Sequence, residues 1–419
     1  MLIEFSVSNF RSFREKKTLS MVATPRLSKK RNVVKAPVTG EKFPDLLKVA
    51  AIYGPNASGK SSLLEALDVV RKLITSAPSA TESLLPVKPF RFDASLKEEP
   101  SRFEYNFIKG GNRYQFNVGL TEKRIVDEKL VFFPRGKETL LYERRLDSTG
   151  EVYIFGEGLE GGKDIHRIWQ RLTSPRVLFI AQAVANSSED LVQLRAPFEW
   201  FARNLTVLAQ GTMPGWSNIS MRILKNNDEL ASNLAGFLQE VDVPISKIRV
   251  DEGEAERMES VGKNVSEHSV APGGEVRTTL THRSLLGEAE FEFSEESGGT
   301  KNLIGFWLPW TSLSLPLQHS SGVLVVDELD SSLHPDIVAD LIEKHLDIGL
   351  ETQLIFTTHD THLMNAKILR RDQFWITERD ANGATNLFSI HDFEGREGED
   401  VEKRYFEGRY RGLPLIRRK

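Results

Sequence analysis

Short apolar runs and alternating segments predict strands at both ends of this sequence. Residues 2–7 alternate apolar and polar side chains, which predicts an edge-type strand. Apolar runs at residues 46–53, 323–326 and 353–356 are each followed by glycine or polar residues, which predicts buried strands. Leucine and valine recur at helical spacing over residues 61–74, so a helix should follow the first of these runs. This order of strands and helices predicts an α/β fold with a mainly parallel core sheet.

The middle of the chain begins with a β-rich pattern. Between residues 86 and 155, apolar and polar side chains alternate in short segments. Two of these segments, 103–107 and 114–118, flank Gly110-Gly111-Asn112. Glycine-rich turns between alternating segments are typical of β-hairpins, so we expect a hairpin here.

A helical pattern follows over residues 189–241. Residues 251–274 are polar and acidic with a Pro-Gly-Gly break, which predicts a mobile loop before short strands at 278–281 and 290–293. We therefore expect a discontinuous core with an insertion. The expected parts are a core of residues 1–75 and 290–419, a β-rich part of the same lobe at 76–185, and a helical insertion with a polar loop at 186–289.

The composition limits the class of protein. Of 419 residues, 40% are hydrophobic and 27% are charged, which is ordinary for a globular chain. No apolar run approaches the roughly 20 residues that span a bilayer. The first residues also lack the basic and then apolar order of a secretory signal. Cysteine is absent, which excludes disulfides and cysteine-based zinc sites and favours a reducing cytoplasm.

The net charge of -4 means that nucleic-acid binding would need a local basic patch. Arg11, Arg14, Lys16 and Lys17 could form such a patch, and a solvated strand-to-loop face is the alternative. The basic residues at 29–31 are expected in a solvated polar loop.

Residues 54–61, Gly-Pro-Asn-Ala-Ser-Gly-Lys-Ser, match the P-loop pattern between a predicted strand and a predicted helix. The glycines let backbone N–H groups curl around phosphate oxygens, and the helix N-terminus adds partial positive charge. Lys60 would reach the β- and γ-phosphates, and the Ser61 hydroxyl would bind Mg²⁺. The residues expected to bind ATP are Gly54, Asn56, Ala57, Ser58, Gly59, Lys60, Ser61 and Ser62.

Asp327 and Glu328 follow the apolar run 323–326, at the carboxyl end of a predicted strand. Ligands bind at this end of the strands in open α/β sheets. A run ending in Asp-Glu is common, but together with a P-loop it predicts a metal site formed by Ser61 and Asp327. Asp327 would hold Mg²⁺ directly or through water, and Glu328 would polarise the attacking water.

Two further segments could contact the phosphates. His359 follows the run 353–356 and could contact the γ-phosphate, although a histidine after a strand is more often a surface or capping residue. Ser297-Gly298-Gly299-Thr300 precedes a helix-like stretch at residues 302–310. Ser297 could cap that helix, and a helix start preceded by Ser-Gly-Gly is an anion site. A plain loop with an N-cap is the alternative interpretation.

These motifs occur in the order P-loop, Ser-Gly-Gly, Asp-Glu strand and histidine, and in this the sequence resembles the ABC-type ATPases. The resemblance is to their soluble SMC-like, RecF-like and OLD-like branch. It implies that residues 297–300 are a degenerate signature motif without the usual leucine and final glutamine. It also implies that Asp330 is the D-loop aspartate, that His359 is the switch histidine, and that Lys60, Glu328 and His359 act in catalysis.

The same resemblance implies a homodimer or higher homo-oligomer with ATP and Mg²⁺ as cofactors. The signature motif of one protomer would close on the ATP held by the P-loop of the other. The Q-loop glutamine is not placed: Gln115 and Gln182 are candidates, but Gln115 has the pattern of an ordinary strand residue.

Both ends of the chain resemble bacterial AAA-type ATPases of phage-defence and abortive-infection systems. Residues 9–13, Asn-Phe-Arg-Ser-Phe, match their start, and the ending at residues 405–414 is similar to their tail with Arg411 added. Relatives of this kind include AbiL or RloA-like, PARIS and Septu ATPases and the ATPase half of OLD nucleases. The resemblance implies a cytoplasmic sensor or regulator subunit. Its partner would be an effector, a nuclease or toxin from the same operon, and DNA or a phage-derived component would be the trigger.

Other functions are weighed against this one. About sixty residues follow His359, too few for the Toprim domain of OLD nucleases, so no nuclease activity is expected in this chain. The acidic residues Asp392, Glu394, Glu397, Glu399 and Asp400 are expected to be a solvated charge run, with a metal site as the alternative.

The main alternative function is a DNA-repair or chromosome-maintenance ATPase that clamps duplex DNA. The sequence contains no long heptad run, so a coiled-coil arm is not expected. A scaffold that binds ATP only structurally is a further alternative, which the intact Lys60, Asp327 and Glu328 disfavour. A transporter subunit and a membrane partner are not expected.

Overall fold

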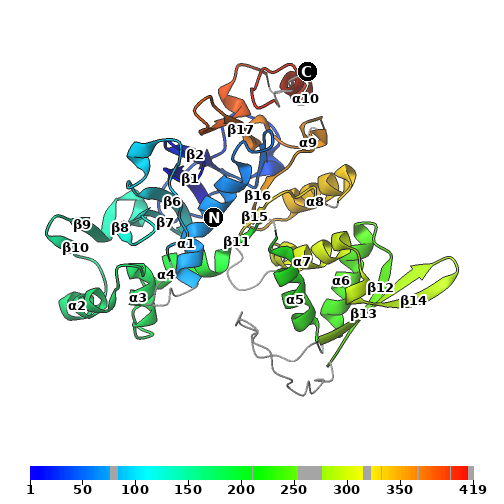
Figure 1. The fold of residues 1–419 in the computed structure, drawn as a ribbon, viewed down its shortest axis with the longest axis horizontal. Helices are drawn as coiled ribbons and strands as arrows, with labels where there is room; N and C mark the ends of the chain where they lie inside the picture. Colours follow the sequence, from blue (N-terminus) through cyan, green and yellow to red (C-terminus); the bar gives the residue numbers. More distant parts are fainter. Residues whose placement is uncertain are drawn as a thin grey trace. The chain divides into compact units, whose positions relative to one another are not determined.

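The computed structural model describes residues 1–75, 84–209, 211–225, 227–252, 276–314, 322–331, 333–365, 368–396 and 398–413. The chain forms two compact units (Figure 1). The first comprises Met1–Ala209, Ser312–Asp330 and His334–Lys419, and the second comprises Gln210–Thr311 and Ser331–Leu333. Most of the polar loop expected at 251–274, together with Glu397 and Pro414, lies outside the described residues.

A six-stranded sheet in the first unit contains the predicted buried runs. Its order is β11 (Leu205–Leu208), β15 (Val323–Val326), β16 (Gln353–Thr357), β5 (Val49–Tyr53), β17 (Phe374–Arg379) and β18 (Thr385–Ser389). The strands are parallel except for β18. Every residue of β5, β15 and β16 is buried, as in parallel sheets covered on both faces. The expected α/β fold with a mainly parallel core sheet is confirmed.

Two strands differ from the sequence expectation. The run 46–53 divides into β4 (Leu46–Leu47) and β5, because the Lys48 N–H donates to the Asn32 carbonyl outside the core sheet. The strand β11 lies inside the segment 189–241, which was expected to be helical. Its hydrogen-bonding partner, β15, is far away in the sequence, so no local periodicity signals this strand.

A seven-stranded antiparallel sheet forms the other layer of this unit. Its order is β10 (Gly150–Phe155), β9 (Thr139–Asp147), β8 (Ile125–Phe133), β7 (Asn112–Leu120), β6 (Ser101–Lys109), β1 (Leu2–Ser8) and β2 (Lys17–Ser20). The predicted hairpin is confirmed as β6–β7, with Gly110 and Gly111 both at positive φ. The expectation that β1 is an edge strand is wrong, since it pairs with β2 on one side and β6 on the other. An alternating pattern of apolar and polar residues indicates that one face of a strand is buried. It does not indicate how many neighbouring strands pair with it.

The helix α1 (Lys60–Thr75) packs against both sheets. Its buried Leu67 belongs to the same apolar cluster as Phe5 of the antiparallel sheet and Ile52 of the parallel sheet. The Tyr105 hydroxyl donates to the Ala66 carbonyl at 3.1 Å, which connects the helix backbone to β6. The predicted helix at 61–74 is thereby confirmed, with one further residue at each end.

The remaining helices of the first unit are α2 (Gly162–Leu172), α3 (Phe179–Ala185), α4 (Arg195–Glu199), α8 (Pro335–Asp347), α9 (His362–Asn365) and α10 (Val401–Phe406). No helix among the described residues is both long and apolar enough to cross a bilayer.

The second unit combines helices with a small antiparallel sheet. Its elements are α5 (Met213–Leu224), α6 (Asp228–Glu240), β12 (Ile245–Glu252), β13 (Val276–Ser284), β14 (Gly287–Glu292) and α7 (Gly298–Ser312). The unit starts at residue 210 and includes α7, whereas the sequence interpretation placed its helical insertion at 186–289 and assigned residue 290 onward to the core. The strands expected at 278–281 and 290–293 correspond to β13 and β14, with Phe293 already in a short 3₁₀ turn.

Candidate functional site

The P-loop connects the buried strand β5 to the long helix α1. Gly59 has a φ of 106° and Gly54 a φ of 150°, and a Cβ atom at either position would overlap with threonines of the β17–β18 hairpin. Ser58 and Lys60 are buried, whereas Asn56 and Ser61 are exposed. The first N–H groups of a helix have no partner inside the helix, so this exposed turn presents donors suited to phosphate oxygens.

The Lys60 ammonium lies over the loop that precedes it. Its Nζ donates to the Gly54 carbonyl at 2.8 Å and to the Pro55 carbonyl at 3.2 Å. Burial lowers the pKa of Lys60, and the carboxylates of Asp327, Glu328 and Asp330 act against that shift. The strands β5 and β15 are the two parallel neighbours of β16, so the P-loop and the Asp-Glu pair lie at the same edge of the sheet.

The acids after β15 are held by a threonine from the neighbouring strand. The Thr357 hydroxyl donates to Oδ1 of Asp327 at 2.7 Å and accepts the Glu328 N–H at 2.7 Å. Asp327 is buried, and Glu328 has a φ of 54°, in the left-handed region. The strain of such a backbone is characteristic of functional positions, where the surrounding structure fixes it.

The predicted switch histidine lies beside the predicted D-loop aspartate. The His359 N–H donates to Oδ2 of Asp330 at 3.4 Å, and the His359 side chain is exposed. A cavity of about 310 Å³ adjoins this segment and the P-loop. Its lining includes Tyr53, Gly54, Pro55, Asn56, Thr358, His359, Thr361, Tyr405, Phe406 and Leu413. The first unit thus brings Lys60, Asp327, Glu328, Asp330 and His359 together.

The second unit contains the predicted signature motif at the start of α7. The Ser297 Oγ accepts the Thr300 N–H at 3.1 Å, so the expected N-cap is confirmed. Ser297 and Gly298 are exposed, and among the described residues a Cβ at Gly298 would point into open space. The N-terminus of this 15-residue helix is therefore accessible to an anion.

Three residues of the site were missed by sequence reasoning: Thr357, Thr377 and Thr385. Thr357 directly follows the apolar run 353–356 and is the last residue of β16. Thr377 and Thr385 lie in the C-terminal hairpin, about 320 residues from the P-loop atoms that they contact. No local pattern indicates such contacts.

The Q-loop candidates stay unassigned. Gln115 lies on β7, and its Nε2 donates to Glu104 Oε1 at 3.0 Å, as expected for an ordinary cross-strand contact. Gln182 lies on α3 and is partly buried.

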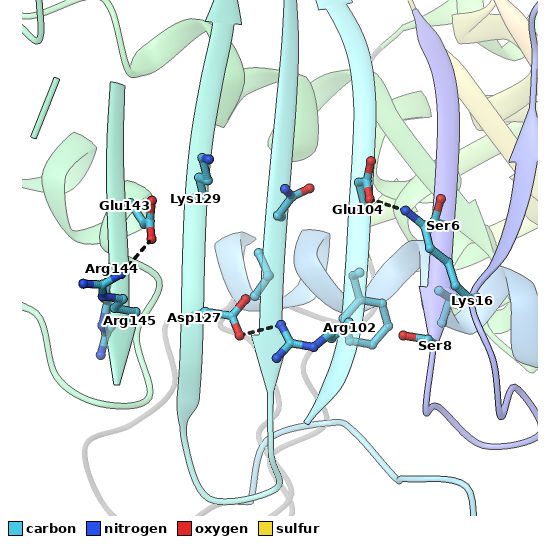
Figure 2. Close-up of a pocket in the computed structure, with 14 residues that line it drawn as sticks. Ser6, Ser8, Lys16, Arg102, Glu104, Asp127, Lys129, Glu143, Arg144 and Arg145 are labelled. Atoms are coloured by element: carbon cyan, nitrogen blue, oxygen red, sulfur yellow. Dashed lines mark hydrogen bonds and ion pairs between the residues drawn. The ribbon is translucent and has the colours of Figure 1, made fainter. Parts of the chain in front are cut away.

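The basic residues near the N-terminus form no uncompensated patch. Arg11 pairs with Glu65 at 2.7 Å, and Arg14 pairs with Asp93 at 2.7 Å. The open face of the antiparallel sheet has the same character, because Lys16 pairs with Glu104 and Arg102 with Asp127 (Figure 2). Cations neutralised in this way would lose part of their attraction for DNA phosphates.

Two basic residues of the segment 29–31 also have partners within the chain. Lys29 donates to the Leu369 carbonyl, and Arg31 pairs with Glu343 of α8 at 3.4 Å. A short 3₁₀ helix replaces the expected loop at Lys30–Asn32.

Three acidic residues of the C-terminal segment have hydrogen-bond or ion-pair partners. Asp400 caps α10 by accepting the Lys403 N–H, Asp392 accepts the Ser389 N–H, and Glu399 pairs with Arg404. Across the described residues, no group of three or more Asp, Glu or His side chains is placed to hold a metal ion. A magnesium site at Ser61 and Asp327 is compatible with this, because Mg²⁺ keeps waters and phosphate oxygens as most of its ligands.

Together, the parallel sheet and the P-loop between β5 and α1 define a P-loop domain with an α/β fold. The family described as "AAA domain, putative AbiEii toxin, Type IV TA system" matches residues 49–365, more than half of the chain, and the chain belongs to this family. A comparison with curated protein sequences gave no match.

Two solved structures of SMC heads align with this chain over nearly its full length. The SmcHead bound to the C-winged helix domain of ScpA has 13% identity and a TM-score of 0.46, covering 93% of this chain and 97% of that one. The SMC head domain from Thermotoga maritima has 16% identity and a TM-score of 0.39, covering 93% and 98%.

Proposed function

We propose that this chain binds and hydrolyses Mg-ATP, dimerises around it, and regulates a separately encoded effector in an anti-phage defence system. The observation that supports hydrolysis most directly is that the P-loop and the Asp327-Glu328 pair follow β5 and β15, the two strands on either side of β16. A structural ATP site needs the phosphate cradle alone. The positioned acids at the end of β15 are additional, and they are the groups that phosphoryl transfer to water requires.

Each residue has a distinct role in this proposal. The backbone N–H groups of residues 56–62 hold the phosphates, and the Lys60 ammonium moves from the Gly54 carbonyl to the phosphate oxygens. Ser61 and Asp327 provide the protein ligands for Mg²⁺, which would supply charge neutralisation at the phosphates. Glu328 orients and polarises the attacking water, and His359 contacts the γ-phosphate.

The proposed dimer, which the resemblance to ABC-type ATPases implies, is supported by two anion sites in the chain. The P-loop provides one at the start of α1, and the second lies at the exposed start of α7 with Ser297 and Gly298. In a two-fold dimer, the α7 site of each protomer closes on the ATP in its partner, so ATP becomes part of the interface. Hydrolysis then weakens that interface.

The defence role rests on the family and on the two chain ends. The family description names a putative AbiEii toxin and a Type IV TA system. Ser12 contacts Thr385, which in turn contacts Ser58 of the P-loop. Tyr405, Phe406 and Leu413 line the cavity beside His359. The segments that resemble defence ATPases therefore lie near the P-loop and His359, where the proposed ATP-dependent change would reach them.

The test of hydrolysis compares two equally buried lysines. Lys60→Met should abolish ATP turnover, whereas Lys109→Met, at a lysine with the same 7% exposure but bonded to Asn204, should not. Turnover that survives in Lys60→Met would overturn the assignment.

The test of the regulatory role is an affinity purification of tagged wild-type and Glu328→Gln protein from the native host. The proposal predicts that a nuclease or toxin from a neighbouring gene co-purifies. Enrichment of DNA alone on the Glu328→Gln protein would instead favour a DNA-clamping ATPase.

A further inference from the structure

The C-terminal β17–β18 hairpin lies against the back of the P-loop. Thr377 of β17 is completely buried, and its Oγ1 lies 3.1 Å from the Tyr53 carbonyl and 2.5 Å from Ser58 Oγ. Thr385 of β18 is 1% exposed, and its Oγ1 lies 2.8 Å from the Ser58 carbonyl. The hairpin therefore contacts both the first and the central part of the loop.

The hairpin and the P-loop lie so close together that only glycine fits at two positions of the loop. A Cβ atom at Gly54 would overlap with the carbonyl and the hydroxyl of Thr377, and a Cβ at Gly59 would overlap with the Thr385 hydroxyl. Both glycines of the motif therefore contact the hairpin, and Thr377 and Thr385 lie at the two points where the loop turns.

The direction of the hydrogen bonds follows from the number of protons. A threonine hydroxyl has one proton, and a carbonyl can only accept. Thr377 therefore donates to the Tyr53 carbonyl and accepts from the Ser58 hydroxyl. If Thr385 donates to the Ser58 carbonyl, Ser12 donates to Thr385 across the 2.8 Å that separates their hydroxyls.

These bonds fix the orientation of two peptide groups. In a trans peptide, the carbonyl oxygen of one residue and the N–H of the next point in opposite directions. Because the Tyr53 and Ser58 carbonyls point at the hairpin, the N–H groups of Gly54 and Gly59 point away from it. A carbonyl turned toward a phosphate would repel it, whereas an N–H attracts it.

We propose that Thr377 and Thr385 are positioning residues that preorganise the P-loop for phosphate binding. They do not contact the nucleotide and act through the orientation of the loop peptides. This inference rests on the proposed function for its effect on ATP, but the loop orientation itself exists without nucleotide.

The hairpin is suited to this role because it is itself well ordered. Thr377 is paired with Leu387, and Arg379 with Thr385, across the two strands. Asp380 accepts the N–H groups of Asn382 and Ala384 in the connecting turn. A rigid hairpin holds the loop with less conformational freedom than a flexible segment would allow.

The test uses isosteric and conservative variants at both threonines. Thr377→Val and Thr385→Val keep the shape and remove the hydroxyl, whereas the corresponding serine variants keep the hydroxyl. Thr173→Val is the matched control, since buried Thr173 donates to the Trp169 carbonyl at 2.7 Å, away from the P-loop.

Two measurements are made on each protein. Amide hydrogen exchange of residues 54–62 without nucleotide should become about tenfold faster in each valine variant, and the Kd for ATP should rise about tenfold, as expected for the loss of one or two buried hydrogen bonds. The serine variants should return to within about threefold of wild type. The Thr173→Val protein should match wild type in both.

The outcomes separate the inference from the proposed function. Valine variants that exchange at the wild-type rate, or serine variants as impaired as the valine ones, would overturn the positioning role. If the wild-type protein fails to bind ATP while the valine variants still lose protection, the proposed function is wrong and the positioning role stands.

Discussion

Thr357 holds Asp327 in place: its hydroxyl lies 2.7 Å from Asp327 Oδ1 and donates to it, and the same oxygen accepts the Glu328 N–H. One side chain of β16 thus fixes both the predicted metal ligand and the backbone of the predicted general base. Thr357→Val should therefore lower ATP turnover about tenfold to a hundredfold, since buried hydrogen bonds to charged groups are among the stronger ones. Turnover measured across a range of Mg²⁺ concentrations checks this.

The matched control for that variant is Thr352→Val. Thr352 is also buried but precedes β16, at the end of the strand away from Asp327. If Thr352→Val lowers ATP turnover as much as Thr357→Val does, the loss comes from general destabilisation of the fold.

His345 should make stability fall in mild acid. This histidine is buried on α8, and burial lowers its pKa from 6.5 to about 4. Between these values, protons bind the unfolded chain and not the folded one, so stability present above pH 6.5 is lost as the pH falls toward 4. Relative to His345→Gln, the wild-type protein should lose about 2 kcal/mol more of its free energy of unfolding between pH 7 and pH 5.

Urea unfolding at the two pH values measures this difference. His391→Gln, at an exposed histidine, is the control and should behave as wild type. An unchanged pH dependence in His345→Gln would show that His345 titrates freely in the folded protein.

A charge at the signature motif should block the site of the partner. Ser297→Arg places a long cation at the exposed start of α7, so ATP turnover should fall more than about tenfold while folding is retained. Ser232→Arg, at an exposed serine of α6 in the same unit, should leave turnover unchanged.

Mixing two inactive variants tests whether Ser297 of one protomer acts at the ATP site of the other. A heterodimer of Ser297→Arg and Lys60→Met contains one site with an intact lysine and an intact serine. Random pairing should therefore restore up to about a quarter of the wild-type turnover. No recovery on mixing would place Ser297 outside the site of the partner.

The sequence predicted the elements that carry local patterns. The strand β15 begins and ends at the residues expected, and the P-loop lies between β5 and α1 as its motif requires. Phosphate-binding loops depend on residues that are adjacent in the chain, so their chemistry is visible in one short segment.

Features that depend on distant pairing could not be predicted. β11 has only four residues and lies within a helical pattern, and it forms a strand because it pairs with β15. The contacts of Thr377 and Thr385 with the P-loop join segments more than 300 residues apart. Only the folded sheet order, with β17 beside β5, brings them together.

The proposed ATP-held dimer is tested most directly by the mass of Glu328→Gln in solution. Without the general base, the protein should bind Mg-ATP and turn it over at least about a hundredfold more slowly, so the closed state should accumulate. Glu343→Gln, at a half-exposed glutamate of α8 that pairs with Arg31, serves as the control. Light scattering after size exclusion should give a mass near twice 47.3 kDa with Mg-ATP and 47.3 kDa without it. A Glu328→Gln protein that binds ATP and stays at 47.3 kDa, or one that hydrolyses ATP at the wild-type rate, would contradict the account.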